Sequence, residues 1–250
     1  MRKRVEWLFI CLLMTQVAYS QDTSYYESGI IQTIANFKDG VPNAKWTYYY
    51  PTGKLNVVEE FRNGVLNGTR VEYYEDGTKK GEETYLENVL EGTATYFYES
   101  GNIRRRGNYK EGVYAGTWST YYDREDTVPL KNKGTYENGY PQGNWIFYNE
   151  TGKKWLEGNF LKGERHGTWY RYSELGTLYY EGDYLFNKKH GKWKVYLDDG
   201  SIKEEGYFAN NKRVGVWRVY RRNGSFKERN YSKGKFLRRL TNIIKKEESY

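Results

Sequence analysis

The chain has 250 residues, enough for one or two domains, and 18% of them are aromatic although all hydrophobic residues together reach only 38%. This composition lacks the aliphatic residues of a thick core and favours a thin β structure with much of its surface in water. The only cysteine is Cys11, so the rest of the chain can form no disulfide or thiolate metal site. The net charge is +8, but acidic and basic residues are mixed, and this balance does not indicate a nucleic-acid partner.

Residues 1–20 have the three parts of a secretory signal peptide. A basic start precedes an apolar run at residues 7–17, and Ala18 and Ser20 supply small residues at the −3 and −1 positions. The apolar run is about half the length that a membrane span needs. We therefore predict cleavage between Ser20 and Gln21 and a secreted or periplasmic protein with no transmembrane span. An uncleaved short anchor is the alternative.

Residues 21–236 form a repeat array with a period of 24 residues. A leading half unit covers residues 25–36, and each later unit opens on an aromatic residue. One interval of 27 residues contains an insertion near residues 124–133, and the last interval is 23 residues long. The opening residues are Phe37, Phe61, Tyr85, Tyr109, Tyr136, Phe160, Tyr184 and Phe208, and Tyr231 continues the series.

Other residue types also recur at fixed distances from the opening aromatic of each unit, and these distances are written as +7, +9 and so on. Position +7 is Gly in every unit except the first, which has Ala44, and position +16 is Gly except in the unit with the insertion. Position +12 is always aromatic. Position +9 is Trp in six of eight units, with Arg70 and Ala94 in the other two: Trp46, Trp118, Trp145, Trp169, Trp193 and Trp217.

Turn signals divide each unit into two short β-rich runs, which predicts two antiparallel strands per unit. We interpret all of these signals as two-residue hairpin turns: Asp39-Gly40, Asn63-Gly64, Asp76-Gly77, Asn138-Gly139, Asp199-Gly200 and Asn223-Gly224. Hairpins are barely stable alone, so neighbouring units must pair. The predicted fold is all-β, one elongated twisted antiparallel meander of about seventeen strands. Positions +9 and +12 have opposite parity, so aromatic side chains should lie on both faces.

Residues 237–250 leave the repeat pattern and form a basic tail. Leu237, Leu240 and Ile243 match a short helical stripe, which predicts a cap or a short C-terminal helix. A helix that binds a membrane surface or a partner is the alternative.

Residues 158–169 (GNFLKGERHGTW) resemble a MORN repeat, and residues 184–193 (YLFNKKHGKW) resemble it next best. With Trp where a second Gly usually stands, and a 24-residue period, the array is similar to the bacterial MORN-variant proteins often labelled YwqK-type antitoxins. This resemblance implies an elongated antiparallel sheet and a role in protein or lipid interaction, and it implies no reaction. Choline-binding repeats are also aromatic hairpins, but their period of about 20 residues differs.

No pattern in the sequence indicates catalysis, a cofactor or a metal site. His166 and His190 occupy the same position in adjacent units, two strands or roughly 9.5 Å apart, too far to bind one metal ion together. Carboxylates such as Glu59, Glu60 and Glu82 lie in polar repeat positions, and nothing sets one apart as a catalytic acid. We predict that the protein is not an enzyme.

The aromatic positions +9 and +12 are the candidate face for a ligand or partner, with a purely structural role as the alternative. The predicted function is a non-enzymatic scaffold that binds an unidentified protein partner. An envelope module that binds glycan or anionic lipid through aromatic and basic side chains is the second hypothesis, and an antitoxin-like protein is the third. The candidate residues are Trp118, Trp145, Trp169, Trp193, Trp217, Tyr121, Tyr148, Tyr172, Tyr196 and Tyr220.

Overall fold

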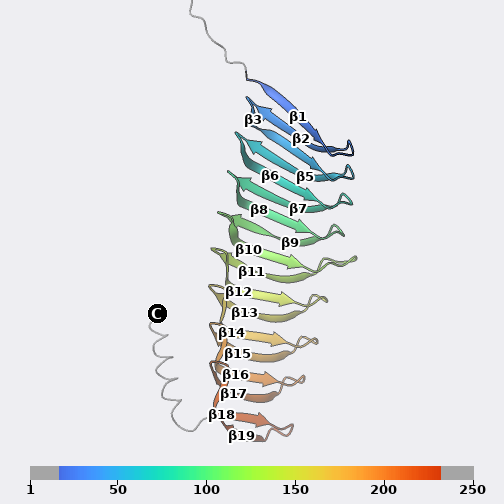
Figure 1. Ribbon diagram of the computed structural model, residues 1–250. Helices are drawn as coiled ribbons and strands as arrows, with labels where there is room; N and C mark the ends of the chain where they lie inside the picture. The colour runs from blue at the N-terminus through green and yellow to red at the C-terminus, as the bar shows by residue number, and fades with distance from the viewer. Residues whose placement is uncertain (1–16, 232–250) are drawn as a thin grey trace, which may run out of the picture.

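A computed structural model describes residues 17–231, which form one single-layer antiparallel β-sheet. Each strand pairs with the next along the chain, except that β3 and β4 both pair with β2, so the hairpins stack in sequence order (Figure 1). No helix that could cross a membrane occurs within the described range. The elongated meander expected from the repeat is therefore confirmed, and the predicted C-terminal tail or helix at residues 237–250 lies outside the described residues.

The sheet has nineteen strands rather than about seventeen, because an additional strand begins at Tyr19 and one strand is split at Asn43. The strands are β1 (Tyr19–Tyr25), β2 (Ile31–Lys38), β3 (Val41–Pro42), β4 (Ala44–Tyr49), β5 (Leu55–Arg62), β6 (Val65–Tyr73), β7 (Lys79–Leu86), β8 (Val89–Phe97), β9 (Ile103–Lys110), β10 (Val113–Tyr121), β11 (Leu130–Glu137), β12 (Tyr140–Tyr148), β13 (Lys154–Leu161), β14 (Glu164–Tyr172), β15 (Leu178–Leu185), β16 (Lys188–Tyr196), β17 (Ile202–Ala209), β18 (Lys212–Tyr220) and β19 (Phe226–Asn230).

The expected signal peptide reaches into β1. Residues 1–16 lie outside the described residues, whereas Tyr19 pairs with Lys38 and Ser20 with Phe37. Cleavage after Ser20 would therefore shorten β1 to residues 21–25 and leave Phe37 and Lys38 paired with β3 alone.

Two kinds of connection alternate along the chain and form the two margins of the sheet. At the turn margin, two-residue turns such as Asn63-Gly64 have positive φ at both residues, 51° and 84°, as hairpin turns with a right-handed strand twist require. Each of these turns also donates to the preceding unit, as in the bond from the Gly163 amide to the Pro141 carbonyl (2.9 Å). The turn margin is thus held together between units.

Connections at the opposite loop margin are longer than the sequence predicted. Asp76-Gly77, Asp199-Gly200 and Asn223-Gly224 are not two-residue turns, because each lies in a loop of five residues between strands. In the first of these loops the Tyr74 amide donates to Thr78 (2.8 Å) and only Gly77 has positive φ, at 99°. The Asx-Gly pair alone could not distinguish the two loop types, since both need a residue with φ above zero.

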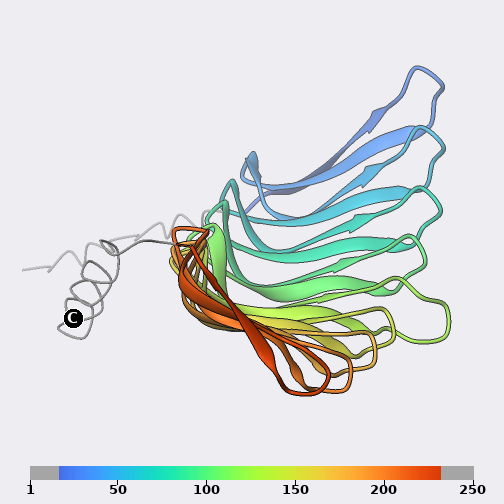
Figure 2. The same cartoon turned by 90° about the horizontal axis from the view of Figure 1, so that it is seen from below.

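A bulge bends every hairpin near the turn margin, and the bend is visible when the sheet is seen along the stack (Figure 2). In β14 the register shifts between Gly158 and Asn159, so that Gly167 and Thr168 are additional residues opposite β13. Gly167 has a φ of 68°, and Ala44, the one non-glycine at position +7, adopts 62°. The recurring Gly at +7 therefore serves the left-handed conformation of the bulge.

Candidate interaction surface

The five Trp candidates from Trp118 to Trp217 form the core of the sheet. Their exposed fractions lie between 0 and 5%. Because the described sheet is one layer, a ring so well buried must lie in the inner angle of the bend, and we call this side the inner face. Each indole N–H donates to a backbone carbonyl across the strand pair, as from Trp169 to Asn159 (3.0 Å) and from Trp217 to Tyr207 (3.0 Å).

Each buried Trp lies over a glycine two positions before an opening aromatic. Trp169 is paired with Gly158 and Trp193 with Gly182, and a Cβ atom added at either glycine would collide with the ring. The opening aromatics pack edge-on against the rings on both sides, so that Phe160, Trp169 and Tyr184 alternate at centroid distances of 5.1 and 6.2 Å. We call this alternating column the aromatic zipper. It continues to Tyr231.

The candidate tyrosines at +12 lie on the other side, the outer face. Tyr172 donates to Glu157 (2.5 Å), and the equivalent bonds run from Tyr196 to Glu181 (2.9 Å) and from Tyr220 to Glu205 (2.7 Å). Tyr121 instead lies under the Arg106 guanidinium, 5.7 Å from the ring centre, and the Tyr148 carbonyl accepts a bond from Tyr122. The sheet therefore separates the +9 and +12 candidates and does not bring them into one groove.

Carboxylates on the outer face are held ionised by these contacts. Burial alone would raise the pKa of Glu157, but hydrogen bonds from Tyr172 and Lys154 outweigh it and leave that pKa below its ordinary value. A hydrogen bond from Lys194 is the main cause of the lowered pKa of Glu181. These contacts link neighbouring strands, and both Glu157 and Glu181 have hydrogen-bonding partners.

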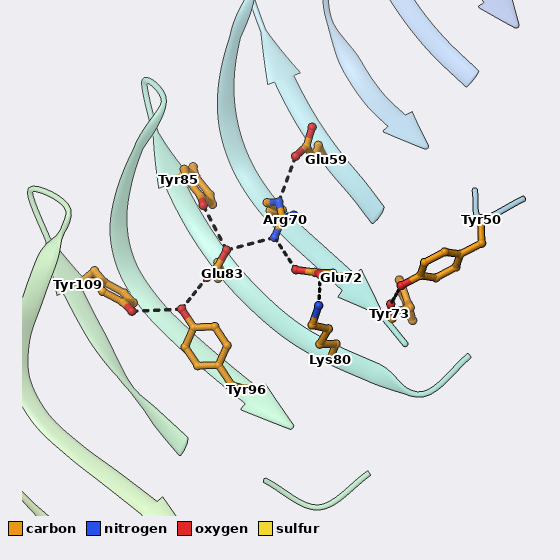
Figure 3. Close-up of polar contacts among 10 residues, drawn as sticks. All are labelled: Tyr50, Glu59, Arg70, Glu72, Tyr73, Lys80, Glu83, Tyr85, Tyr96 and Tyr109. Carbon is orange, nitrogen blue, oxygen red and sulfur yellow. Dashed lines mark hydrogen bonds and ion pairs between the residues drawn. The ribbon is translucent and has the colours of Figure 1, made fainter. Parts of the chain in front are cut away.

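The inner face changes where Arg70 and Ala94 replace Trp, and Figure 3 shows the polar contacts around Arg70. Arg70 stands directly opposite Glu59 on one side and Glu83 on the other, and it bonds both at 3.1 and 3.4 Å. Its guanidinium also contacts Glu72 at 3.2 Å. The Trp and its two glycines are thus replaced as a set by an arginine and two glutamates.

Tyrosines and a lysine complete this polar network. Glu83 accepts from Tyr85 (3.1 Å) and from Tyr96 (2.5 Å), whose hydroxyl lies 3.2 Å from that of Tyr109. Burial, followed by the charge of Glu83, raises the pKa of Tyr85 to about 12. Burial would raise the pKa of Glu72, but bonds from Lys80 and Arg70 leave it lowered. The network is internally satisfied, which is typical of a structural cluster.

A basic column lies on the inner face of the last three complete units. Arg165, Lys189 and Arg213 stand opposite the opening aromatics of their own units. Their charged groups lie over the Trp rings of the zipper, at 4.6, 4.4 and 3.9 Å from the ring centres. Such contacts place a cation on the inner surface without burying it completely.

Sequence reasoning missed three of these features. The glycine two residues before the opening aromatic is itself periodic and changes to Glu59 and Glu83 on either side of Arg70, a signal that could have predicted the network. The basic residues at position +5 were also visible in the repeat. A third periodic feature is the hydroxyl donated by Tyr50, Tyr74 and Tyr98 to the carbonyl at +12 of the next unit (2.7 to 2.9 Å).

No group of His, Cys, Asp and Glu within residues 17–231 could hold a metal ion. His166 and His190 stand opposite Asn159 and Asp183. The His166 ring lies 5.4 Å from that of Phe186, near the turn margin.

Comparison with known proteins gives one family. The family model described as MORN repeat variant matches residues 23–39, 42–63, 66–87, 90–111, 165–185 and 189–210. No curated protein matches the sequence. Among solved structures, a porin-like protein from Bacteroides uniformis is similar at 11% identity, with 85% of this chain and 88% of that chain covered. The TM-score of 0.18 is too low to support any argument about function.

Proposed function

Because the chain belongs to the MORN repeat variant family, we propose that it is a non-enzymatic scaffold, secreted or periplasmic, that binds a protein partner along its sheet. MORN repeats are generally modules of protein or membrane interaction rather than catalysts. The signal peptide inferred for residues 1–20 supports the location.

The observation that carries this proposal is the single-layer sheet, whose side chains repeat at the same place in unit after unit over nineteen strands. A repeat protein of this kind presents a long periodic surface, and such surfaces suit extended partners. The inner face also differs between its halves, with the glutamate network near Arg70 and the basic column from Arg165 onward. This difference in charge between the two halves would determine which end of an extended partner binds to which end of the sheet.

A crosslinking pull-down tests the scaffold. The mature chain, beginning at Gln21, is mixed with an envelope extract of the source organism, and crosslinked peptides are identified by mass spectrometry. We expect one partner whose crosslinks map to several consecutive units. Crosslinks scattered over many proteins with no shared site would contradict the proposal. N-terminal sequencing of the secreted protein checks the cleavage, and an intact Met1 would contradict the location.

The basic column also favours a second candidate, a module that binds anionic lipid or glycan. In that case the mature chain would sediment with envelope membranes or wall material after crosslinking, without a protein partner.

The burial of Trp169 and Trp193 supports a structural role for these rings under either function. Their replacement by alanine should therefore lower stability, by about 3–5 kcal/mol each.

A further inference from the structure

The basic column is confined to one part of the sheet. Position +5 holds Arg165, Lys189 and Arg213 in the last three complete units, whereas the four preceding units have uncharged residues there. These are Leu66, Leu90, Tyr114 and Pro141. The aromatic zipper begins earlier: the Trp118 ring has the Arg105 guanidinium over it at 5.7 Å, whereas the Trp145 ring is buried in a unit that has Pro141 at +5. The cations are therefore not needed wherever a Trp is buried, and packing alone does not account for them.

Two of the three cations form no ion pair within the described residues, although the charge of Glu204 acts on Lys189. Among residues 17–231, no ion pair involves Arg165 or Lys189, whereas Arg213 binds Glu204 at 2.9 and 2.5 Å. Burial, followed by the charge of Arg213, lowers the pKa of Lys189. This part of the inner face is thus positively charged, and it offers charge complementarity to an anionic partner.

The spacing of the column limits the shape of that partner. Equivalent residues in adjacent units are two strands apart, roughly 9.5 Å. A polyproline II chain has three residues per turn and advances roughly 9.3 Å per turn, so that every third side chain points the same way. In a β-strand, side chains on one face recur at roughly 6.7 Å, which does not match.

The position of the column within the bend argues against a flat partner. The column lies on the inner face, in the concave angle of the hairpins, and a planar bilayer would contact the convex side or the margins first (Figure 2). An extended chain can lie along the angle, parallel to the stack. The exposed sides of the stacked guanidinium and ammonium groups then face it.

We propose that the inner face around Arg165, Lys189 and Arg213 binds an extended acidic segment of a protein partner that has a carboxylate at about every third residue. The segment lies parallel to the stack, with one carboxylate per repeat unit. This assignment rests on the proposed scaffold function and names the chemistry of its partner.

Peptide binding tests the spacing. Two fluorescent peptides of identical composition are compared by anisotropy with the mature chain, one of Glu-Pro-Pro repeats and one with all its glutamates grouped at one end. We expect the periodic peptide to bind about tenfold more tightly, since only it can place a carboxylate at each cation. Equal affinity for both peptides would overturn the proposed spacing.

Paired variants test the residues. Arg165→Gln with Lys189→Gln should weaken binding of the periodic peptide by about tenfold. The control, Lys188→Gln with Lys203→Gln, removes the same charge from exposed positions on the outer face and should change affinity by no more than about twofold. Equal weakening by both pairs would show that only net charge matters and would overturn the site. Circular dichroism verifies that each variant is folded, and the spacing comparison needs no variant.

Two further outcomes separate this inference from the proposed function. Binding to vesicles of phosphatidylserine and phosphatidylcholine, lost in the Arg165/Lys189 variant, together with no peptide binding, would assign the column to lipid. A partner captured equally well by the mature chain and by that variant would leave the scaffold function intact and overturn the inner-face site.

Discussion

A glycine opposite each buried Trp is the residue on which the aromatic zipper depends. At Gly182 the missing side chain leaves the space that the Trp193 ring occupies, and a Cβ atom would collide with three atoms of the indole. The requirement is steric and not conformational, because the φ of this glycine is not positive. It explains why the periodic Gly and the periodic Trp are found together.

We predict that Gly182→Ala lowers the free energy of unfolding by about 1–3 kcal/mol, since the ring must leave its place or the strands must separate. Gly81→Ala is the control, because the nearest atom to its added Cβ would be a Tyr96 ring carbon at 3.3 Å. Urea denaturation of both variants, monitored by Trp fluorescence, measures the difference. Equal losses would mean that the contact with the ring is not the cause.

Ionisable residues set a pH range for stability. Burial and the charge of Glu83 raise the pKa of Tyr85 to about 12, so the neutral phenol is favoured in the folded state. Its contribution to stability is complete below the ordinary tyrosine pKa near 10 and is lost as the pH rises toward about 12. The lowered pKa of Glu72 acts in the opposite sense, and its contribution is lost as the pH falls below about 4.5.

The free energy of unfolding should therefore be highest between about pH 5 and 10 and should fall on either side. Urea titrations over this range measure it, and Tyr85→Phe should reduce the fall on the alkaline side. A curve that stays flat above pH 10, or a Tyr85→Phe curve identical to that of the unaltered chain, would contradict this assignment.

At the scale of the single element, the two-residue turns share one conformation although their sequences differ. The first turn residue is Asp or Asn in four turns, at positions 39, 63, 138 and 210, and Glu, Lys or Phe in four others, at positions 87, 111, 162 and 186, and all of them adopt a φ near 50°. Residues other than Gly, Asn and Asp are strained in this left-handed region. Pairing of the flanking strands imposes the turn on them.

Glu111→Asn should therefore stabilise the chain by about 0.5–1 kcal/mol, because asparagine tolerates the positive φ better. The reverse change at the equivalent position, Asn138→Glu, should destabilise it by a similar amount. Thermal unfolding of the two variants provides the measurement. A shift of the same sign in both would exclude the backbone explanation.

The Arg70 network joins three neighbouring strands, β5, β6 and β7. Arg70→Trp alone should lower the free energy of unfolding by about 2–4 kcal/mol, because the ring would meet Glu59 and Glu83 where it needs glycine. Adding Glu59→Gly and Glu83→Gly should recover most of this loss by extending the zipper. Denaturant titrations compare the single and triple variants, and equal stabilities would show that the residues do not act as a set.

At the scale of the molecule, the network divides the sheet into two blocks. From Tyr109 to Tyr231 the aromatic contacts are continuous, with Tyr114 linking Trp118 to Tyr136. Near the other end, Trp46 packs separately against Phe37, Tyr48 and Phe61. Each unit touches only its neighbours, so stability along a repeat array is the sum of local and nearest-neighbour contributions. A weak interface can then separate two transitions.

We expect unfolding in two stages, with the strands before β8 opening at lower denaturant than β10 to β19. Hydrogen exchange followed by mass spectrometry would show this as faster exchange in the N-terminal strands. The triple variant at Arg70, Glu59 and Glu83 should bring the two stages closer together. Uniform exchange over all described strands would contradict the division.

The fold could be predicted from the sequence because its signal is repeated in every unit, whereas a single hairpin would have been ambiguous. The separation of Trp169 and Tyr172 onto two faces also followed from strand parity. The burial of the Trp rings did not, because parity says which residues share a face and not that the hairpin bends around one face. That bend arises from the bulge at Gly167, and the spacing of residues in the sequence does not predict the positive φ of this glycine.

The loop margin has a practical consequence. The loop between β10 and β11 is longer than the others, yet the Tyr122 amide still donates to the Pro129 carbonyl at its base (3.0 Å). The Tyr98 amide donates to the Asn102 carbonyl in the same way in a five-residue loop (2.8 Å). The sheet thus tolerates additional residues there without losing register. Foreign peptides inserted into successive loops would be displayed in a row, spaced roughly 9.5 Å apart. The chain could therefore serve as a scaffold that holds antigens or enzymes at a fixed, nanometre-scale spacing.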